Sequence, residues 1–395
     1  MSLLEGYIFV KRIIAWPIIP ISLLIIYCYK SFDPIQPLES PQIVFVSNRF
    51  TIANILQVFM MDVSGSNVKR ITFDSNNYFY PQFSPDGSYI IIYSRNGIND
   101  EIYRMDINGE NFANLSNSPG NDNLPQFSPD GSKIVFTSDR DGNREIYIMN
   151  DGSNQRRLTN NNFIDHSPQF SPDGMKIVFY SLTYYPYSDD GYDIYTINID
   201  GTNLTKLTPD NRYFLNTAIT GEDGPNVLDA APRYSPDGSK IIFMTSVQNN
   251  YVINMINMDG SNPVTIIGQA GMNFAPFFYP NVSKILFRSH RDGDFDLYCA
   301  DFGGNEQTRI TNDTGHTYFA DFSDDGSKIL YFSNIDENSH EYYHIYIANS
   351  DGSQLIKLTH GDFIDYFPNF RPLKLNNTAI LKLNSLAILI NISNY

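Results

Sequence analysis

Short apolar runs, each four to six residues long, follow one another along most of the chain and are separated by polar turns. The segment "KIVFTS" (133–138) is one such run, and "EIYIMN" (145–150) is the next. Runs of this length that are rich in Val, Ile, Phe and Tyr and bounded by Gly, Pro, Asn and Asp are typical of β-strands. We therefore expect an all-β fold.

The strand signals recur as a unit of four, which we call a, b, c and d in chain order. Strand a is short and aromatic, and the tight turn that follows it is usually Ser-Pro-Asp-Gly. Pro fixes φ at the first turn position, and Asp-Gly supplies the left-handed conformations that a hairpin needs. The a segments lie at 81–83, 125–127, 168–170, 232–234, 276–278, 320–322 and 368–370.

Strand b is the most apolar member of the unit, and strand d is a brief segment such as "RLT" or "KLT" after a second turn that contains Gly. The b segments lie at 43–47, 90–94, 134–138, 177–181, 241–245, 285–289 and 329–333. The a segments recur every 43–48 residues apart from one interval of 64, which indicates an insertion of about 20 residues. Four antiparallel strands repeated at this period are typical of one blade of a β-propeller.

The two ends of the repeat array are out of phase. The array begins with a b strand at Ile43 and ends with an a strand at Phe370. The last a strand can complete the first blade, which closes the ring and leaves no open sheet edge. The count then predicts seven blades over residues 43–372, because six blades would leave one b-c-d set without an inner strand.

The repeat "PQFSPDGSKIVFTS" (125–138), with "EIYIMN" and "RLT" after it, resembles the repeat of the TolB-type propellers, which are related to the WD-type propellers. The resemblance covers about 330 of the 395 residues and implies a propeller fold. TolB proteins are periplasmic, carry an α/β domain before a six-bladed propeller and bind a peptidoglycan-associated lipoprotein. This chain lacks that α/β domain, has seven predicted blades and carries Phe or Tyr in place of the usual Trp. We therefore transfer the fold and not the role in the Tol system.

An uncharged apolar segment precedes the repeats. Residues 13–29, "IIAWPIIPISLLIIYCY", follow Lys11 and Arg12 and are followed by Lys30. A transmembrane helix needs roughly 17–25 residues, so this segment is long enough to span a membrane. The positive-inside rule places residues 1–12 in the cytoplasm. No Ala-x-Ala cleavage site follows, which favours a retained signal-anchor over a cleaved signal peptide.

Composition and charge limit the classes of partner and chemistry. The net charge of −16 argues against nucleic acid, because phosphate binding needs a basic face. It is compatible with a basic protein partner or a cation. The chain has no Gly-x-Ser-x-Gly elbow and no appended hydrolase domain, so nothing supports a serine peptidase.

The connections between strands are of two kinds. The a–b and c–d turns are nearly the same in every repeat, whereas the d–a and b–c loops vary; the longest are a d–a loop at 209–231 and b–c loops at 182–193 and 334–344. Variable loops on a constant scaffold usually carry binding sites. The alternative is that these loops pack only on themselves. We predict a binding rim that contains Tyr184, Tyr185, Tyr187, Tyr192, Tyr213 and Phe214.

A carboxylate recurs three residues before the a strand. The four members of this set are Asp122, Asp165, Asp229 and Asp365, and the other blades carry Tyr78, Asn273 and Thr317 at the same position. Converging carboxylates would form a ring at the entrance of the central channel and recruit Ca²⁺ or a basic partner. The alternative is that each Asp caps its own turn. Both interpretations stay open at the level of sequence.

Two histidine patterns suggest metals. "HEYYH" (340–344) matches a zinc-protease motif that needs a helix, but it leads into strand c, where its two histidines would be roughly 13 Å apart. We therefore predict no zinc site there. His166, His316 and His360 fall in d–a loops, at different positions relative to strand a. The oligogalacturonate lyases, seven-bladed propellers with similar repeats, bind a metal through channel histidines, and that resemblance implies an alternative activity.

The sequence thus predicts an anchor at 13–29, a linker at 30–42, a seven-bladed propeller at 43–372 and a tail at 373–395 of unassigned structure. The predicted function is non-catalytic binding of a protein or peptide on the extracytoplasmic side of a membrane, in the periplasm or at the cell surface. No cofactor is expected, unless the carboxylate ring binds Ca²⁺. Two further functions fit the same sequence, a metal-dependent carbohydrate lyase and a structural subunit of an envelope complex.

Overall fold

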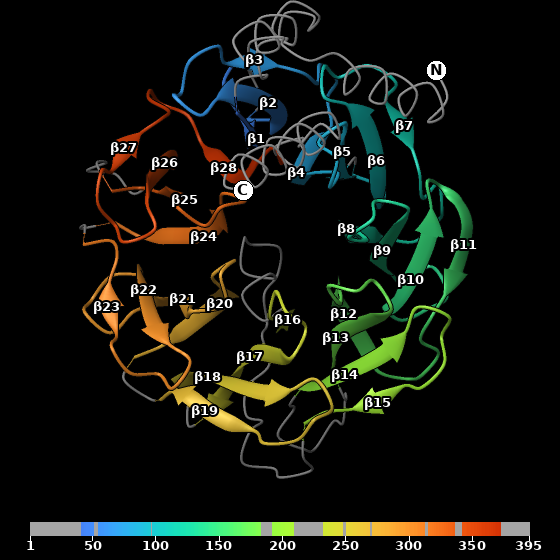
Figure 1. Cartoon of the computed structure of the whole chain (residues 1–395). Helices are drawn as coiled ribbons and strands as arrows, with labels where there is room; N and C mark the ends of the chain where they lie inside the picture. Colours follow the sequence, from blue (N-terminus) through green and yellow to red (C-terminus); the bar gives the residue numbers. More distant parts are fainter. Residues whose placement is uncertain are drawn as a thin grey trace, which may run out of the picture. The chain divides into compact units, whose positions relative to one another are not determined.

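The structure, a computed structural model, describes residues 41–50, 54–95, 97–182, 192–208, 232–247, 250–268, 271–312, 315–335 and 342–372. These residues form seven four-stranded antiparallel sheets around a central axis (Figure 1). The chain is therefore an all-β, seven-bladed propeller, as predicted. Within the described ranges no helix is long and apolar enough to cross a membrane. The predicted anchor at 13–29 lies outside the described residues.

Each blade contains strands a to d, ordered from the axis outward. Blade 1 consists of β28 (Asp365–Phe370), β1 (Gln42–Ser47), β2 (Gln57–Asp62) and β3 (Lys69–Arg70), and blade 2 of β4 (Asn77–Phe83), β5 (Tyr89–Arg95), β6 (Asp100–Asp106) and β7 (Ala113–Asn114). Blade 3 consists of β8 (Asp122–Phe127), β9 (Lys133–Ser138), β10 (Glu145–Asn150) and β11 (Ser153–Arg157), and blade 4 of β12 (Ile164–Phe170), β13 (Lys176–Leu182), β14 (Tyr192–Asn198) and β15 (Thr205–Lys206). Blade 5 consists of β16 (Arg233–Tyr234), β17 (Lys240–Val247), β18 (Asn250–Asn257) and β19 (Val264–Ile267). Blade 6 consists of β20 (Asn273–Phe278), β21 (Lys284–Ser289), β22 (Asp296–Asp301) and β23 (Thr308–Arg309). Blade 7 consists of β24 (Thr317–Phe322), β25 (Lys328–Ser333), β26 (His344–Asn349) and β27 (Ile356–Lys357).

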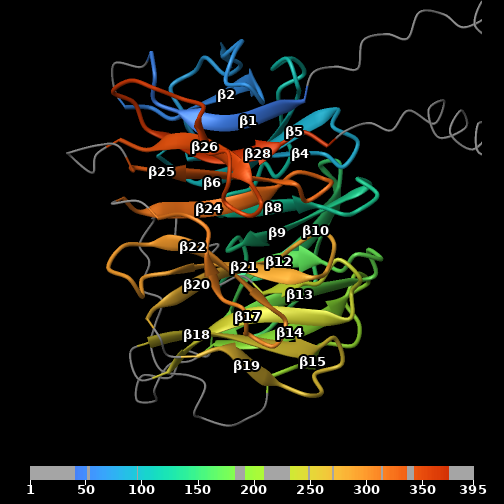
Figure 2. The same ribbon diagram turned by 60° about the vertical axis from the view of Figure 1, so that its left-hand side comes forward.

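The two ends of the array pair in blade 1. Strand β28 lies beside β1 in both views (Figures 1 and 2), and the two strands are antiparallel, with Ile43 opposite Phe370. The chain beyond β28 is held as well, because Arg371 donates from its backbone to the carbonyl of Gln42 at 2.9 Å and from its side chain to the carbonyl of Gly87 at 2.9 Å. The predicted closure of the ring is confirmed.

The middle strands of each blade form the core. In β9, for example, Ile134, Val135 and Phe136 are at most 1% exposed. Each sheet is covered on both faces by its neighbours around the ring, so side chains that point in either direction are buried. That double burial explains why strand b reads as a continuous apolar run instead of an alternating one.

The inner strands begin three or four residues earlier than the a segments that we predicted in blades 1, 2, 3, 4, 6 and 7. A β-bulge before the proline separates the two parts, and its residue has a left-handed backbone: Tyr80 (φ 49°), Leu124 (52°), Ser167 (52°), Ala275 (46°) and Phe367 (52°). Non-glycine residues in this region cost about 1–3 kcal/mol each. The prediction that His166 lies in a d–a loop is wrong, because it lies in β12 before this bulge.

The Ser-Pro-Asp-Gly turns stabilise themselves. In blade 3, Ser128 Oγ donates to the carboxylate of Asp130 at 2.6 Å and accepts from the backbone N–H of Lys133 at 2.9 Å. Hydrogen bonds from Ser128 and Ser132 lower the pKa of Asp130 to about 2. The recurring Ser and Asp of the repeat therefore have a structural role in this turn.

The glycines of the c–d turns serve a second purpose. Each of those with a left-handed backbone packs against the end of strand d of the preceding blade or the residue after it, most closely at Gly304 (φ 75°), where an added Cβ would lie 1.7 Å from the carbonyl oxygen of Ile266. Gly201 has a similar backbone (φ 88°), but the nearest atom to its added Cβ is 3.7 Å away.

This difference gives a stability prediction. Gly304→Ala is expected to lower the free energy of unfolding by about 1–3 kcal/mol more than Gly201→Ala, because both variants strain a left-handed backbone and only the first forces two blades apart. Urea unfolding followed by circular dichroism measures both variants. Equal losses would contradict the close approach at Gly304.

Candidate binding site on the variable face

The connections of each blade lie at two opposite ends. We call the end with the a–b and c–d turns the constant face and the end with the d–a and b–c loops the variable face. The predicted residues Asp122, Asp165 and Asp365 lie at the variable-face ends of β8, β12 and β28, and all three are 0% exposed. Their charges are therefore removed from solvent and need partners within the protein.

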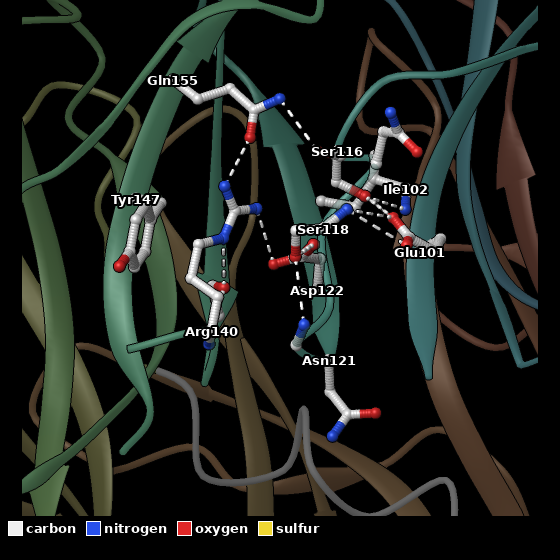
Figure 3. A network of polar contacts seen from close by, with 12 residues as sticks. Glu101, Ile102, Ser116, Ser118, Asn121, Asp122, Arg140, Tyr147 and Gln155 are labelled. Carbon is white, nitrogen blue, oxygen red and sulfur yellow. Dashed lines mark hydrogen bonds and ion pairs between the residues drawn. The ribbon is translucent and has the colours of Figure 1, made fainter. Parts of the chain in front are cut away.

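Asp122 finds its partners in its own blade and its neighbour (Figure 3). One carboxylate oxygen accepts from Arg140 Nη2 at 2.8 Å and the other from Ser118 Oγ at 2.7 Å. Arg140, in the b–c loop, also donates to Gln155 Oε1 at 2.6 Å. The carboxylate thus joins the inner strand to the b–c loop of the same blade.

Asp365 has an equivalent arginine. Arg49 Nη2 donates to it at 2.7 Å, and His344 Nδ1 lies 3.7 Å from its other oxygen. Burial alone would raise the pKa of Asp365, but these two neighbours hold that pKa below its usual value. In blade 6 a neutral version of the pair joins Arg291 to Asn273 at 3.1 Å.

Asp165 differs, because no basic side chain forms an ion pair with it among the residues that the structure covers. It accepts a hydrogen bond from Asn161 Nδ2 at 2.8 Å, and burial raises its pKa to about 6. Within the described ranges no three His, Cys, Asp or Glu side chains are close enough to hold a metal ion. Asp229 lies outside the described residues, and Ca²⁺ binding stays a prediction.

Of the six residues of the predicted aromatic rim, the structure describes only the backbone of Tyr192. Tyr184, Tyr185, Tyr187, Tyr213 and Phe214 lie outside the described residues. The backbone of Tyr192 begins β14 opposite Leu182. The binding role of these six residues stays a prediction.

The histidines lie in different surroundings. His166 is buried, and burial together with Arg144 lowers its pKa to about 3. Arg144 donates to its Nε2 at 3.2 Å, so the neutral ring carries its proton on Nδ1 and donates to Ser167 Oγ at 3.0 Å. In this tautomer the ring does not accept a proton from Ser167. His344 begins β26, as predicted for "HEYYH", whereas His340 lies outside the described residues. The lyase alternative stays a prediction.

A layer of cross-strand pairs that sequence reasoning did not single out lies one residue beyond the carboxylate position. In each pair, the residue of strand a that follows the carboxylate position faces the fourth residue of the b segment. The described pairs are Phe79–Tyr93, Asn123–Thr137, His166–Tyr180, Phe274–Arg288, Tyr318–Phe332 and Tyr366–Val46. The signal that could have found them is variation, because this b-strand position changes between blades, while the three residues before it stay Ile, Val, Leu, Phe or Tyr and the residue after it stays Ser or Thr.

Much of this layer is aromatic, and its rings touch from blade to blade. The chain of contacts, with distances between ring centroids, is Phe274–Phe295 (5.7 Å), Phe295–Tyr318 (6.4 Å), Tyr318–Tyr343 (5.6 Å), Tyr343–Tyr366 (5.4 Å), Tyr366–Phe367 (5.6 Å), Phe367–Tyr80 (4.1 Å) and Tyr80–Tyr93 (5.9 Å). We call these eight residues the aromatic arc. It extends over blades 6, 7, 1 and 2, whereas the layer in blades 3 and 4 consists of Asn123, Thr137, His166 and Tyr180.

The positively charged side chain of Arg288 packs against three rings of the arc, and two tyrosines of the arc have neutral hydroxyl groups. Arg288 is 4% exposed, and its guanidinium carbon lies 5.1, 4.6 and 4.5 Å from the ring centroids of Phe274, Phe295 and Tyr318. Such cation–π contacts hold the three rings together. Burial and the nearby Tyr318 raise the pKa of Tyr343, and burial raises that of Tyr366 to about 12. Both hydroxyl groups therefore remain protonated at neutral pH.

The seven sheets and the repeat define the class of protein, a β-propeller. Within that class, the TolB beta propeller domain family matches residues 42–228 and 224–381, so the chain belongs to that family. No curated protein matches the chain in sequence.

Solved structures share the fold at low sequence identity. An oligogalacturonate lyase in complex with manganese is 17% identical, with a TM-score of 0.59 and coverage of 81% of this chain and 86% of that chain. The β-propeller domain of the Trilobed protease from Pyrococcus furiosus is 15% identical, with a TM-score of 0.59 and coverage of 82% and 98%. TolB from Acinetobacter baumannii is 19% identical, with a TM-score of 0.48 and coverage of 88% and 70%. At these identities the likeness concerns the fold alone.

Proposed function

We propose that this propeller binds a protein or peptide without catalysing a reaction, and that the aromatic arc on the variable face is the binding site. The observation that supports this function is the contrast between the two faces. Half-buried rings such as Phe274, Tyr318 and Tyr366 gather on the variable face, whereas the same Ser-Pro-Asp-Gly turn recurs on the constant face. Aromatic side chains offer large contact areas at little entropic cost and are enriched at interfaces.

We also propose that residues 13–29 anchor the protein in a membrane and that the propeller lies on the extracytoplasmic side, in the periplasm or at the cell surface. The uncharged run and the basic residues before it support this arrangement.

Site-specific photo-crosslinking tests the proposed function. Benzoylphenylalanine at Phe79 or Tyr366 is expected to give discrete protein adducts in cells that express the full chain. Tyr366 belongs to the aromatic arc, and Phe79 stacks on Tyr93 of the arc with a distance of 5.3 Å between ring centroids. The same probe at Ser132 or Ser239, exposed in Ser-Pro-Asp-Gly turns of the constant face, is expected to give none. Denaturing gels and mass spectrometry of the adducts measure the outcome. Adducts only from the constant face would contradict the proposed site.

A further inference from the structure

Three blades build the same corner between the b–c loop and strands c and d. Arg49, Arg140 and Arg291 hold equivalent positions in blades 1, 3 and 6, and each donates from Nε to a serine Oγ of strand b at 2.9 Å. Each guanidinium carbon also lies 4.6–5.5 Å from the centroids of two rings in strands b and c. The three corners therefore share one framework and can be compared position by position.

In blades 3 and 6 this corner is ionic. In blade 3, Asp141 accepts a hydrogen bond from the hydroxyl of Tyr147, and Arg157 lies 3.6 Å from Asp141 and pairs with Glu145. In blade 6 the same positions hold Asp292, Tyr298, Arg309 and Asp296, with Tyr298 bonded to Asp292 and Arg309 paired with Asp296. Each arginine of strand d thus faces two carboxylates of its own blade.

In blade 1 both carboxylates are absent and the arginine is kept. Phe50 stands where blade 3 has Asp141, Phe59 replaces Tyr147, and Gln57 replaces Glu145. Arg70 is opposite Phe59 in the sheet, just as Arg157 is opposite Tyr147.

Arg70 keeps the backbone contact of its equivalents but has a neutral neighbour. Its Nε donates to the carbonyl of Thr72 at 2.6 Å, as Arg157 does to Thr159 at 2.6 Å. Its Nη2 donates to the neutral amide oxygen of Gln57 at 3.1 Å. In the described part of the chain no carboxylate forms an ion pair with Arg70, whereas Arg157 and Arg309 each form one.

Two aromatic side chains of this corner face solvent. Phe50 is 77% exposed and Phe73, which replaces Asn160 of blade 3, is 75% exposed. Phe50 is also held at φ 61°, a backbone region that a bulky residue rarely adopts. Its ring contacts Phe59 and Phe363 at centroid distances of 6.4 and 6.2 Å, and the guanidinium of Arg70 lies over Phe73 at 5.1 Å. Two other blades of the same chain avoid this exposure of apolar surface, so folding alone does not explain it.

We propose that the corner of blade 1, formed by Phe50, Gln57, Phe73, Arg70 and Phe363, docks a peptide segment of the partner that carries an apolar side chain beside a carboxylate. The apolar side chain packs against the exposed rings, and the carboxylate pairs with Arg70, in the place that Glu145 and Asp296 fill in the ionic corners. This inference rests on the proposed function, because Phe363 leads along the chain into β28 and Tyr366 of the aromatic arc.

A synthetic probe tests the inference without the natural partner. The probe is a fluorescein-labelled peptide of Phe-Asp pairs separated by glycines, and the comparison peptide carries Phe-Lys pairs. The full chain is expected to bind the Phe-Asp peptide at least tenfold more tightly by fluorescence anisotropy in 0.15 M NaCl, where charges farther than about 8 Å are largely screened. Equal binding of the two peptides, or no binding of the Phe-Asp peptide, would overturn the inference.

Variants that copy the ionic corner localise the binding. Gln57→Glu places a carboxylate beside Arg70, and the triple variant Phe50→Asp, Gln57→Glu, Phe59→Tyr rebuilds the arrangement of blade 3. Both are expected to weaken Phe-Asp binding at least tenfold, whereas Ser239→Glu, which adds the same charge on the constant face, leaves it unchanged. Circular dichroism verifies that the variants fold. Unchanged binding in Gln57→Glu and in the triple variant overturns the inference, while crosslinks at Phe79 and Tyr366 would still support the proposed function.

Discussion

Replacement of Arg49 by alanine is expected to lower the free energy of unfolding by about 3–5 kcal/mol, the usual cost of leaving one member of a buried ion pair without its partner. Arg49 is 6% exposed, and its carboxylate partner Asp365 is 0% exposed. The pair joins the b–c loop of blade 1 to β28, the strand that closes the ring. Urea unfolding of the full chain, followed by circular dichroism, measures the loss.

Blade 6 supplies a matched control for this prediction. Arg291 occupies the position of Arg49, but its partner Asn273 is neutral. The amide nitrogen of Asn273 already donates to three backbone carbonyls. Arg291→Ala should therefore cost only about 1–2 kcal/mol. The double variant Arg49→Ala, Asp365→Asn should recover part of the loss, because it copies the neutral residue of blade 6. Equal losses for the two arginines would show that the buried charge is not the cause.

The repeat predicted much of the fold for a physical reason. Strands b and c are buried on both faces, so their apolar character is strong, and the phase of the first and last strands determines the pairing of β1 with β28. The starts of the inner strands were not predictable in the same way. A left-handed residue such as Tyr80 or Leu124 interrupts the strand before its proline, and the bulge breaks the alternation from which a strand is recognised.

The candidate site was less accessible to sequence reasoning. Alignment of the repeats found Asp122 and Asp365, but their arginine partners follow Asp122 by 18 residues and precede Asp365 by 316, so their pairing appears only in the folded sheet. The aromatic arc could not be found from what the repeat keeps constant. Binding residues such as those proposed here differ between blades, so the informative positions are those at which the repeat varies.

Two neighbouring residues of β12 have opposite effects on stability as pH changes. Asp165 has a pKa of about 6 in the folded protein, raised by burial, so the folded state takes up its proton before the unfolded state does and becomes more stable as pH falls. His166 has a pKa of about 3, lowered by burial and by Arg144. The unfolded chain therefore takes up a proton below pH ~6.5 that the folded chain does not, and stability is lost. Between pH 7.5 and 4 the Asp165 effect amounts to about 2 kcal/mol and the His166 effect to about 3 kcal/mol, so the two largely cancel.

Single substitutions should separate the two effects. Relative to the parent chain, the free energy of unfolding of His166→Asn is expected to rise by about 3 kcal/mol from pH 7.5 to pH 4, and that of Asp165→Asn to fall by about 2 kcal/mol. Asparagine is a fair replacement at both positions, because Asn123 and Asn273 occupy them in blades 3 and 6. Urea unfolding at four pH values between 4 and 7.5 measures the differences, in which the titration of all other groups cancels. The free energy of unfolding of the double variant should change with pH as that of the parent does. If the free energies of both single variants also changed with pH as that of the parent does, the burial of these two groups would not control their protonation.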